Sequence, residues 1–98
     1  MTYEISAGEL LNKLEQGEHP HIIDIREDFE VQMGMLKTAV HIPMNEIPNA
    51  MPELKVNEPY YILCAHGVRS EKVTEYLREH DFDAYNVLGG MAAIEQTT

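Results

Sequence analysis

The only cysteine of the chain, Cys64, opens a short polar segment that contains Gly67, Arg69 and Ser70. An ionised thiol is a strong nucleophile, and the planar guanidinium of an arginine binds oxyanions. Gly67 lets the backbone turn with a positive φ or approach a ligand closely. These residue types at this spacing predict a cradle in which an anion is bonded to sulfur or attacked by it.

The segment connects a predicted strand to a predicted helix. Residues 59–63 form an uncharged apolar run rich in aromatic and β-branched side chains, which is typical of a buried strand. Apolar residues follow at helical spacing after Ser70. The loop in between consists of Cys64, Ala65, His66, Gly67, Val68, Arg69 and Ser70. A cysteine there lies at a helix N-terminus, where unpaired N–H groups and the helix dipole lower the thiol pKa.

A second interpretation is that Cys64 is an inert core residue, because free cysteine is among the most buried residue types. The polar, glycine-containing segment after it favours a solvent-facing turn instead. Arg69 taken alone is typical of a solvated helix start, and its spacing from Cys64 makes it a candidate anion ligand. His66 could hold an acceptor or shift the thiol pKa, but an exposed bystander fits its position equally well.

Asp24 and Arg26 form a second candidate group, because they come at the C-terminal end of a predicted strand over residues 21–25. Parallel α/β sheets gather their ligands at this edge. Two interpretations stay open, namely contact with substrate and a structural ion pair, for example between Arg26 and Glu30.

Metal centres and disulfides are not expected. A single cysteine forms no internal disulfide, and no Cys/His ligand set for structural zinc is present. The histidines at positions 19, 21, 41, 66 and 80 lack metal-site spacing. The methionines, including Met33, Met35 and Met44, are interpreted as flexible packing rather than as a copper site.

Composition limits the classes of function. The 98 residues predict one domain, 1–98, which we expect to be a monomer. The net charge of −10 disfavours binding to nucleic acid and to anionic membranes. Neither a signal peptide nor an apolar run of about 20 residues is visible, so no membrane span is expected. We expect a cytoplasmic location, where the reducing pool keeps Cys64 a thiol.

Predicted strands and helices alternate along the chain. The strands are expected at 3–5, 21–25, 39–42, 59–63 and 84–88. The helices are expected between Ser6 and Gly17, over 27–33, after a cap at Asn45, from Ser70 onward, and as one or two closing turns in 91–95. The strongest local signature is the capping box of Ser6 and Glu9. The alternation predicts an α/β fold with a largely parallel sheet, helices on both faces, and the site at the C-terminal strand ends.

Several short motifs, each weak alone, form an ordered set along nearly the whole chain. They are Asp24-x-Arg26-Glu27, then Glu30, Gly34, Ala39 and Ile42-Pro43, then Cys64-x-x-Gly67-x-Arg69-Ser70, and finally Asn86-Val87-x-Gly89-Gly90. This set resembles the single-domain rhodanese sulfurtransferases. The resemblance implies the rhodanese-like fold, a five-stranded, mainly parallel sheet with short helices on both faces.

The resemblance also implies a mechanism centred on Cys64. Its thiolate would attack the sulfane sulfur of a small anionic donor such as thiosulfate, form a persulfide and release sulfite. Backbone N–H groups of residues 65–70 would stabilise the sulfur, while Arg69 and Arg26 would attract the donor. Cyanide or a cellular thiol would accept the sulfur, the thiol being thioredoxin, glutathione or a sulfur-carrier protein. No cofactor or metal is required.

Three positions depart from the usual family pattern. Met35 stands where a histidine is common, Thr38 where a glycine is common, and Ile94 where a tryptophan is frequent. These positions lie in the wall of the site and the closing helix, so they bear on substrate preference and stability more than on the thiol.

Two alternative functions remain. A cysteine-dependent phosphatase or arsenate reductase also uses a thiolate at a helix N-terminus, but the loop from Cys to Arg is longer there, and Leu63 replaces the histidine that often precedes the phosphatase cysteine. A non-catalytic rhodanese-like binding or regulatory module is the other alternative. The intact Cys64, Gly67 and Arg69 argue against it.

Overall fold

Five parallel strands form one sheet in the order β1-β5-β4-β2-β3, which confirms the predicted α/β architecture. The computed structural model describes residues 3–97. The strands are β1 (Glu4–Ile5), β2 (His21–Asp24), β3 (Val40–His41), β4 (Pro59–Leu63) and β5 (Asp83–Val87). The helices are α1 (Ala7–Glu15), α2 (Asp28–Val31), α3 (Ile47–Ala50), α4 (Val68–Glu79) and α5 (Gly90–Thr97), and the short 3₁₀ turns are η1 (Met44–Glu46) and η2 (Met51–Glu53).

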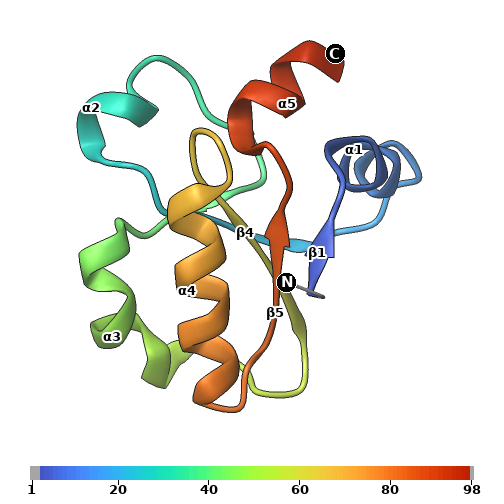
Figure 1. Cartoon of the computed structure of the whole chain (residues 1–98). Helices are drawn as coiled ribbons and strands as arrows, with labels where there is room; N and C mark the ends of the chain where they lie inside the picture. The colour runs from blue at the N-terminus through green and yellow to red at the C-terminus, as the bar shows by residue number, and fades with distance from the viewer. Residues whose placement is uncertain (1–2, 98) are drawn as a thin grey trace.

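Helices cover both faces of the sheet. In Figure 1, α3 and α4 lie on one side of the strands, and α1 and α5 lie on the other. The strand β4 explains this arrangement, because its Ile62 belongs to the core under α4 while its Tyr61 and Leu63 belong to the core under α1 and α5. A strand buried on both faces reads as a continuous apolar run, as in the sequence. Cys64, which follows β4, lies on the α4 side.

Local signals set most element boundaries. The capping box of Ser6 and Glu9 is present, as predicted, and Glu9 N–H donates to Ser6 Oγ at 3.1 Å. The predicted helix start at Ser70 is two residues late, because Gly67 serves as the N-cap of α4 with a φ of 91°. The closing helix α5 runs farther than the predicted 91–95, and α2 is shorter than the predicted 27–33.

The predicted cap at Asn45 is wrong. Asn45 lies inside η1, whose N-cap is Pro43, and η1, α3 and η2 follow one another where a single helix was expected. Pro48 and Pro52 lie in this stretch and lack the N–H groups that a continuous helix needs, so the chain forms short turns instead.

The methionines do not all pack as predicted. Met33 is 89% exposed and Met44 is 41% exposed, and both follow the C-terminal end of a strand.

Over residues 3–97, no helix combines the length and apolar character that crossing a bilayer demands.

Candidate active site

Cys64 is buried, with 1% of its surface exposed, yet its sulfur is surrounded by polar groups. The Sγ atom accepts the N–H of Gly67 at 3.1 Å and the N–H of Ser70 at 3.3 Å. The hydroxyl of Ser70 lies 3.2 Å from the same sulfur. The low exposure agrees with the core interpretation of the cysteine, but the sulfur faces the hydrogen-bond donors of its own loop. An inert core thiol has no such ring of donors.

The loop closes around the sulfur because Gly67 adopts a left-handed conformation. Its φ of 91° is positive, which is one of the two roles that the sequence suggested for this glycine. A Cβ at this position would also lie 3.0 Å from the backbone nitrogen of Gly89 and 3.4 Å from the carbonyl oxygen of Val87. Glycine is therefore required both by the turn and by the close approach of the chain after β5.

The pKa of the Cys64 thiol is lowered from its ordinary value. Burial acts to raise this pKa, but the hydrogen bond with the Ser70 hydroxyl and the backbone N–H groups of Ser70, Gly67 and His66 outweigh it. These groups lie at the N-terminus of α4, whose dipole also favours an anion. A lowered pKa increases the thiolate fraction at neutral pH, and the thiolate is the nucleophile.

The residues after β5 hold the loop from the other side. Met91 N–H donates to Cys64 O at 2.8 Å, and Ala92 N–H donates to Ala65 O at 3.0 Å. A Cβ on Gly90 would lie 2.4 Å from that Cys64 oxygen, so a side chain there would displace the loop. The double glycine thus allows α5 to begin directly against the cysteine.

Asn86 is a site residue whose role was missed from the sequence. It is buried in β5, its Nδ2 donates to Gly67 O at 3.2 Å, and its Oδ1 accepts the hydroxyl of Ser70. It therefore orients the hydroxyl that contacts the sulfur. The available signal was its place two residues after the buried Ala84, which puts a polar side chain at an inward-facing strand position.

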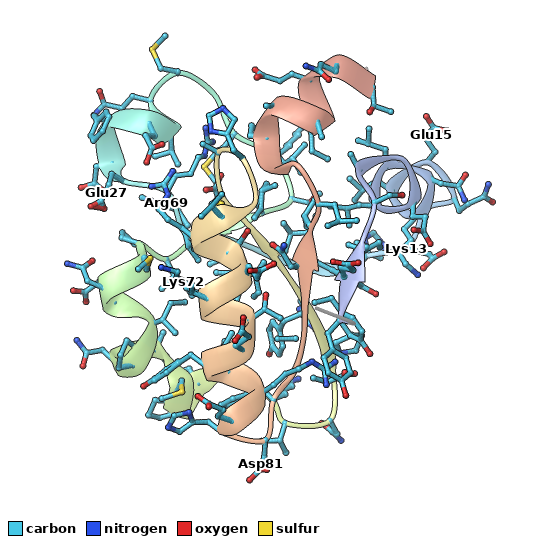
Figure 2. The ribbon with its side chains drawn as sticks, viewed as in Figure 1. Lys13, Glu15, Glu27, Arg69, Lys72 and Asp81 are labelled. Carbon is cyan, nitrogen blue, oxygen red and sulfur yellow. The ribbon has the colours of Figure 1, made fainter. Side chains whose placement is uncertain are left out.

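Arg69 forms a bidentate ion pair with Glu30 of α2. Its Nη1 and Nη2 atoms lie 2.8 Å from the two carboxylate oxygens. This hydrogen bond lowers the pKa of Glu30 to about 2. The Arg69 side chain keeps 35% of its surface exposed and lies on the α2 side of α4, near Glu27 in Figure 2. The predicted anion ligand is thus held by a carboxylate at the edge of the site.

Asp24 and Arg26 form the structural ion pair that was one of two interpretations, but Arg26 does not pair with Glu30. The carboxylate of Asp24 accepts the Nε and Nη2 groups of Arg26, with Nη2 to Oδ2 at 2.9 Å. The Nη2 group also donates to Gly34 O at 2.8 Å. Both residues are buried, so the pair fastens the segment that carries α2.

The remaining loop side chains are arranged around the backbone ring. His66 and Val68 are exposed, whereas Ala65 is half-buried. Their backbones shape the loop, and their side chains form no hydrogen bond to the sulfur among the contacts of residues 3–97.

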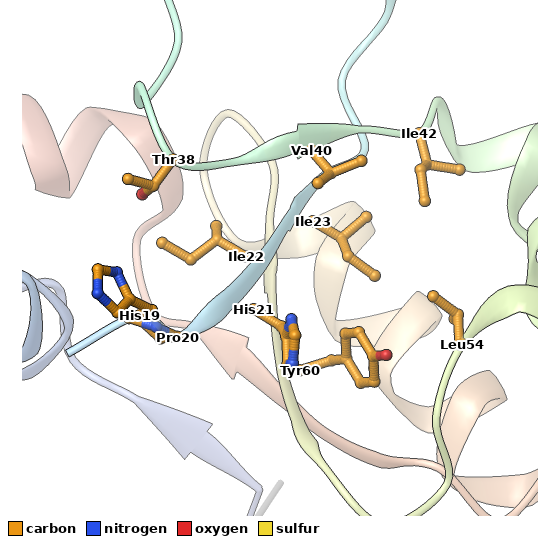
Figure 3. A pocket seen from close by; sticks show the side chains of 10 residues that line it. All are labelled: His19, Pro20, His21, Ile22, Ile23, Thr38, Val40, Ile42, Leu54 and Tyr60. Carbon is orange, nitrogen blue, oxygen red and sulfur yellow. The ribbon is translucent and has the colours of Figure 1, made fainter.

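A separate hollow of about 550 Å³ lies along β2 and β3, as Figure 3 shows. Its lining includes His19, His21 and Tyr60 together with apolar residues such as Val40. It contains neither a cysteine nor a carboxylate, and none of its lining residues belongs to the Cys64 loop. Within residues 3–97, no group of three or more His, Cys, Asp and Glu side chains could hold a metal ion.

Comparison with known proteins agrees with this geometry. Residues 6–97 match the family model described as "Rhodanese-like domain". The chain is 45% identical over 95 residues to "Putative sulfurtransferase YtwF" of Bacillus subtilis, covering 97% of this chain and 92% of that protein. It is 34% identical over 89 residues to "Putative sulfur carrier protein YrkF" of Bacillus subtilis, covering 90% of this chain and 48% of that protein.

A solved structure gives the same result for the fold. The rhodanese-like domain protein from Staphylococcus aureus superposes with a TM-score of 0.91 at 46% identity, covering 95% of this chain and 91% of that one. The name of the relative that is 45% identical, a putative sulfurtransferase, supports an activity of the sulfurtransferase kind. The family model and these two relatives each cover nearly the whole chain, and the chain belongs to the rhodanese-like domain family.

Proposed function

We propose that this protein is a sulfurtransferase that carries a sulfane sulfur on Cys64. The Cys64 thiolate attacks the outer sulfur of an anionic donor such as thiosulfate. A bond forms between Sγ and that sulfur, the sulfur–sulfur bond of thiosulfate breaks, and sulfite leaves with its electron pair. The resulting persulfide is then attacked by a thiophilic acceptor, either cyanide in an assay or a cellular thiol, which regenerates the thiolate.

The observation that carries the proposal is the ring of donors at Sγ. Two backbone N–H groups, of Gly67 and Ser70, donate to the sulfur within 3.3 Å. The Ser70 hydroxyl oxygen, whose hydrogen is donated to Asn86 Oδ1, lies 3.2 Å from the sulfur and completes its polar surroundings. Donors fixed by the fold stabilise negative charge without reorganisation during the reaction. The same ring suits the thiolate before transfer and an anionic persulfide afterwards.

Arg69 supplies positive charge at the edge of this ring. Its pKa is raised, first by the hydrogen bond to Glu30 and also by the negative charge of Cys64. The guanidinium and the thiolate therefore stabilise each other, and the 35% of the Arg69 side chain that is exposed can be reached by an anion from solvent. Arg26 takes no part in donor binding in this proposal, because Asp24 and Gly34 O occupy its Nε and Nη2 groups.

Loss of the thiol tests the proposal directly. After incubation with thiosulfate, the intact protein should gain about 32 Da on Cys64, and cyanide or dithiothreitol should remove that mass. Cys64→Ala should show no gain. Retention of the added mass in Cys64→Ala would overturn the assignment, as would hydrolysis of p-nitrophenyl phosphate that depends on Cys64 with no turnover of thiosulfate.

The cellular setting follows from the same chemistry. A thiol that must stay reduced between turnovers fits the cytoplasm, and residues 1–98 would act as one domain and as a monomer. Thioredoxin, glutathione and a sulfur-carrier protein are the candidate acceptors.

A further inference from the structure

Large apolar side chains are exposed around the Cys64 loop. They are Phe29 (72% exposed), Met33 (89%), Met44 (41%), Val68 (67%) and Leu88 (41%), and we call this set the apolar rim. Its members follow the C-terminal ends of β2, β3, β4 and β5. Because all of these strands are parallel, the topology brings the rim to the sheet edge that carries Cys64. Grouped exposed apolar side chains mark interaction surfaces.

Contacts place the segments that carry the rim beside the loop. The ion pair of Arg69 with Glu30 fastens α2, which bears Phe29, beside the start of α4. The close approach of Gly67 to the backbone of Gly89 brings the chain after β5 next to the loop. Met44 lines a mostly apolar groove of about 220 Å³ with side chains of α3 and of α4, the helix that begins in the loop.

The neighbouring groove is acidic. A hollow of about 570 Å³ lies between α2 and η1, with Phe29 in its lining. The charged residues that line it are Glu27, Asp28 and Glu46, all carboxylates. Two basic groups face these carboxylates: His41 Nδ1 lies 3.9 Å from Asp28 Oδ1, and Arg69, already paired with Glu30, lies near Glu27. This groove adds a local negative potential to the net charge of −10.

We propose that the apolar rim and the acidic groove form the docking surface for a basic protein that presents a cysteine thiol to the Cys64 persulfide. The inference rests on the proposed function and names the class of acceptor. A protein can cover the rim with apolar side chains and place Lys or Arg in the groove. A small thiol such as glutathione has no surface that covers the rim and no cationic side chains that reach the groove.

The transfer itself is a balanced exchange between thiols. The acceptor thiolate attacks the terminal sulfur of the persulfide and forms a new sulfur–sulfur bond. The bond from that sulfur to Sγ breaks, and its electron pair returns to Cys64 as thiolate. The acceptor leaves as a persulfide, and no external oxidant or reductant takes part.

Three acceptors test the proposal on the full-length protein loaded with thiosulfate. Two synthetic peptides carry one cysteine between Leu and Phe, with three Lys in one peptide and three Glu at the same positions in the other, and glutathione is the third acceptor. The rate of loss of the persulfide mass is measured for each. The Lys peptide should react about tenfold faster than the Glu peptide at low ionic strength, and salt should narrow the gap.

Substitutions in the acidic groove and in the apolar rim test which part of the surface causes the preference for the Lys peptide. Glu27→Lys with Asp28→Lys should lower the preference for the Lys peptide about fivefold, whereas Glu15→Lys, on α1 at the other side of the molecule in Figure 2, should leave it unchanged. Phe29→Ser with Met33→Ser should lower the ratio of the Lys-peptide rate to the glutathione rate about threefold.

The outcomes separate this inference from the proposed function. Failure to form the persulfide would overturn the proposed function and the inference with it. Formation of the persulfide with equal rates for the two peptides would overturn the docking surface alone. Faster discharge by glutathione than by the Lys peptide, or an equal effect of Glu15→Lys, would do the same.

Discussion

Two acid–arginine pairs at the C-terminal edge of the sheet differ in burial, and the difference separates their roles. The side chains of Asp24 and Arg26 are 0% and 7% exposed, and those of Glu30 and Arg69 are 20% and 35% exposed. A buried pair leaves an uncompensated charge when either partner is removed, whereas water compensates the charge in an exposed pair. The first pair therefore serves the fold, and the second can respond to a ligand.

The two pairs also act over different distances along the chain. Asp24 and Arg26 are two residues apart and fix the end of β2, where Arg26 also binds Gly34 O. Glu30 and Arg69 are 39 residues apart and hold α2 against α4. Four experiments test or sharpen this comparison.

The largest effect is expected from the buried pair. Asp24→Ala leaves Arg26 buried without a counter-charge, so the free energy of unfolding should fall by about 3–5 kcal/mol. Glu30→Ala, the matched change in the half-exposed pair, should cost about 1 kcal/mol. Urea denaturation measures both. If Asp24→Ala does not fold, the milder Asp24→Asn provides the value, and equal costs for the two pairs would refute the comparison.

The second largest effect is expected from a substitution at Gly90, which packs against the backbone of the Cys64 loop. Gly90→Ala places a Cβ 2.4 Å from Cys64 O in a residue with a φ of 59°. Gly17→Ala is the matched control, because its φ of 81° is also positive but nothing lies within 4 Å of the new Cβ. Gly90→Ala should cost about 1–3 kcal/mol more than the control in urea denaturation and should slow persulfide formation. An equal loss in the free energy of unfolding for the two variants would show that the loop moves away from the new Cβ without destabilising the fold.

The sulfur itself should respond to Ser70. Ser70→Ala removes the hydroxyl that lowers the pKa of Cys64, so this pKa should rise and the rate of persulfide formation at neutral pH should fall about tenfold. The rate should increase with pH through the thiol pKa in both proteins, at higher pH in the variant. The ultraviolet absorbance of the thiolate provides the titration. An unchanged titration would leave the lowered pKa to the backbone N–H groups alone.

The smallest effect is the dependence of stability on pH at Glu30. Its pKa is lowered from 4.5 to about 2 by Arg69, so its contribution is fully present above pH 4.5 and is lost as the pH falls toward 2. The difference in melting temperature between the wild type and Glu30→Gln should therefore narrow across this window. A difference that stays constant from pH 5 to about pH 2 would contradict the assigned ion pair.

Local patterns were predictable from the sequence to the extent that their partners are close along the chain. The capping box joins Ser6 and Glu9, which are three positions apart. The positive φ of Gly67 is set within a loop of only seven residues. The alternation of strands and helices, with the apolar run of β4, predicted a parallel sheet and its active edge. By contrast, Asn45 is a residue type that favours the N-cap position, but the prolines after it prevent the continuous helix that it would begin.

The sequence by itself determined which atoms could do chemistry, namely a thiol at a helix start with a glycine and an arginine at set spacing. Only the tertiary structure decided which groups surround that thiol, because β5 lies beside β4 in the sheet and brings Asn86 and Gly90 to the loop. It also decided that Arg69 pairs with Glu30 while Arg26 pairs with Asp24. Ion pairs form between groups that are close in space, and the order of the strands in the sheet determines which charged groups are close.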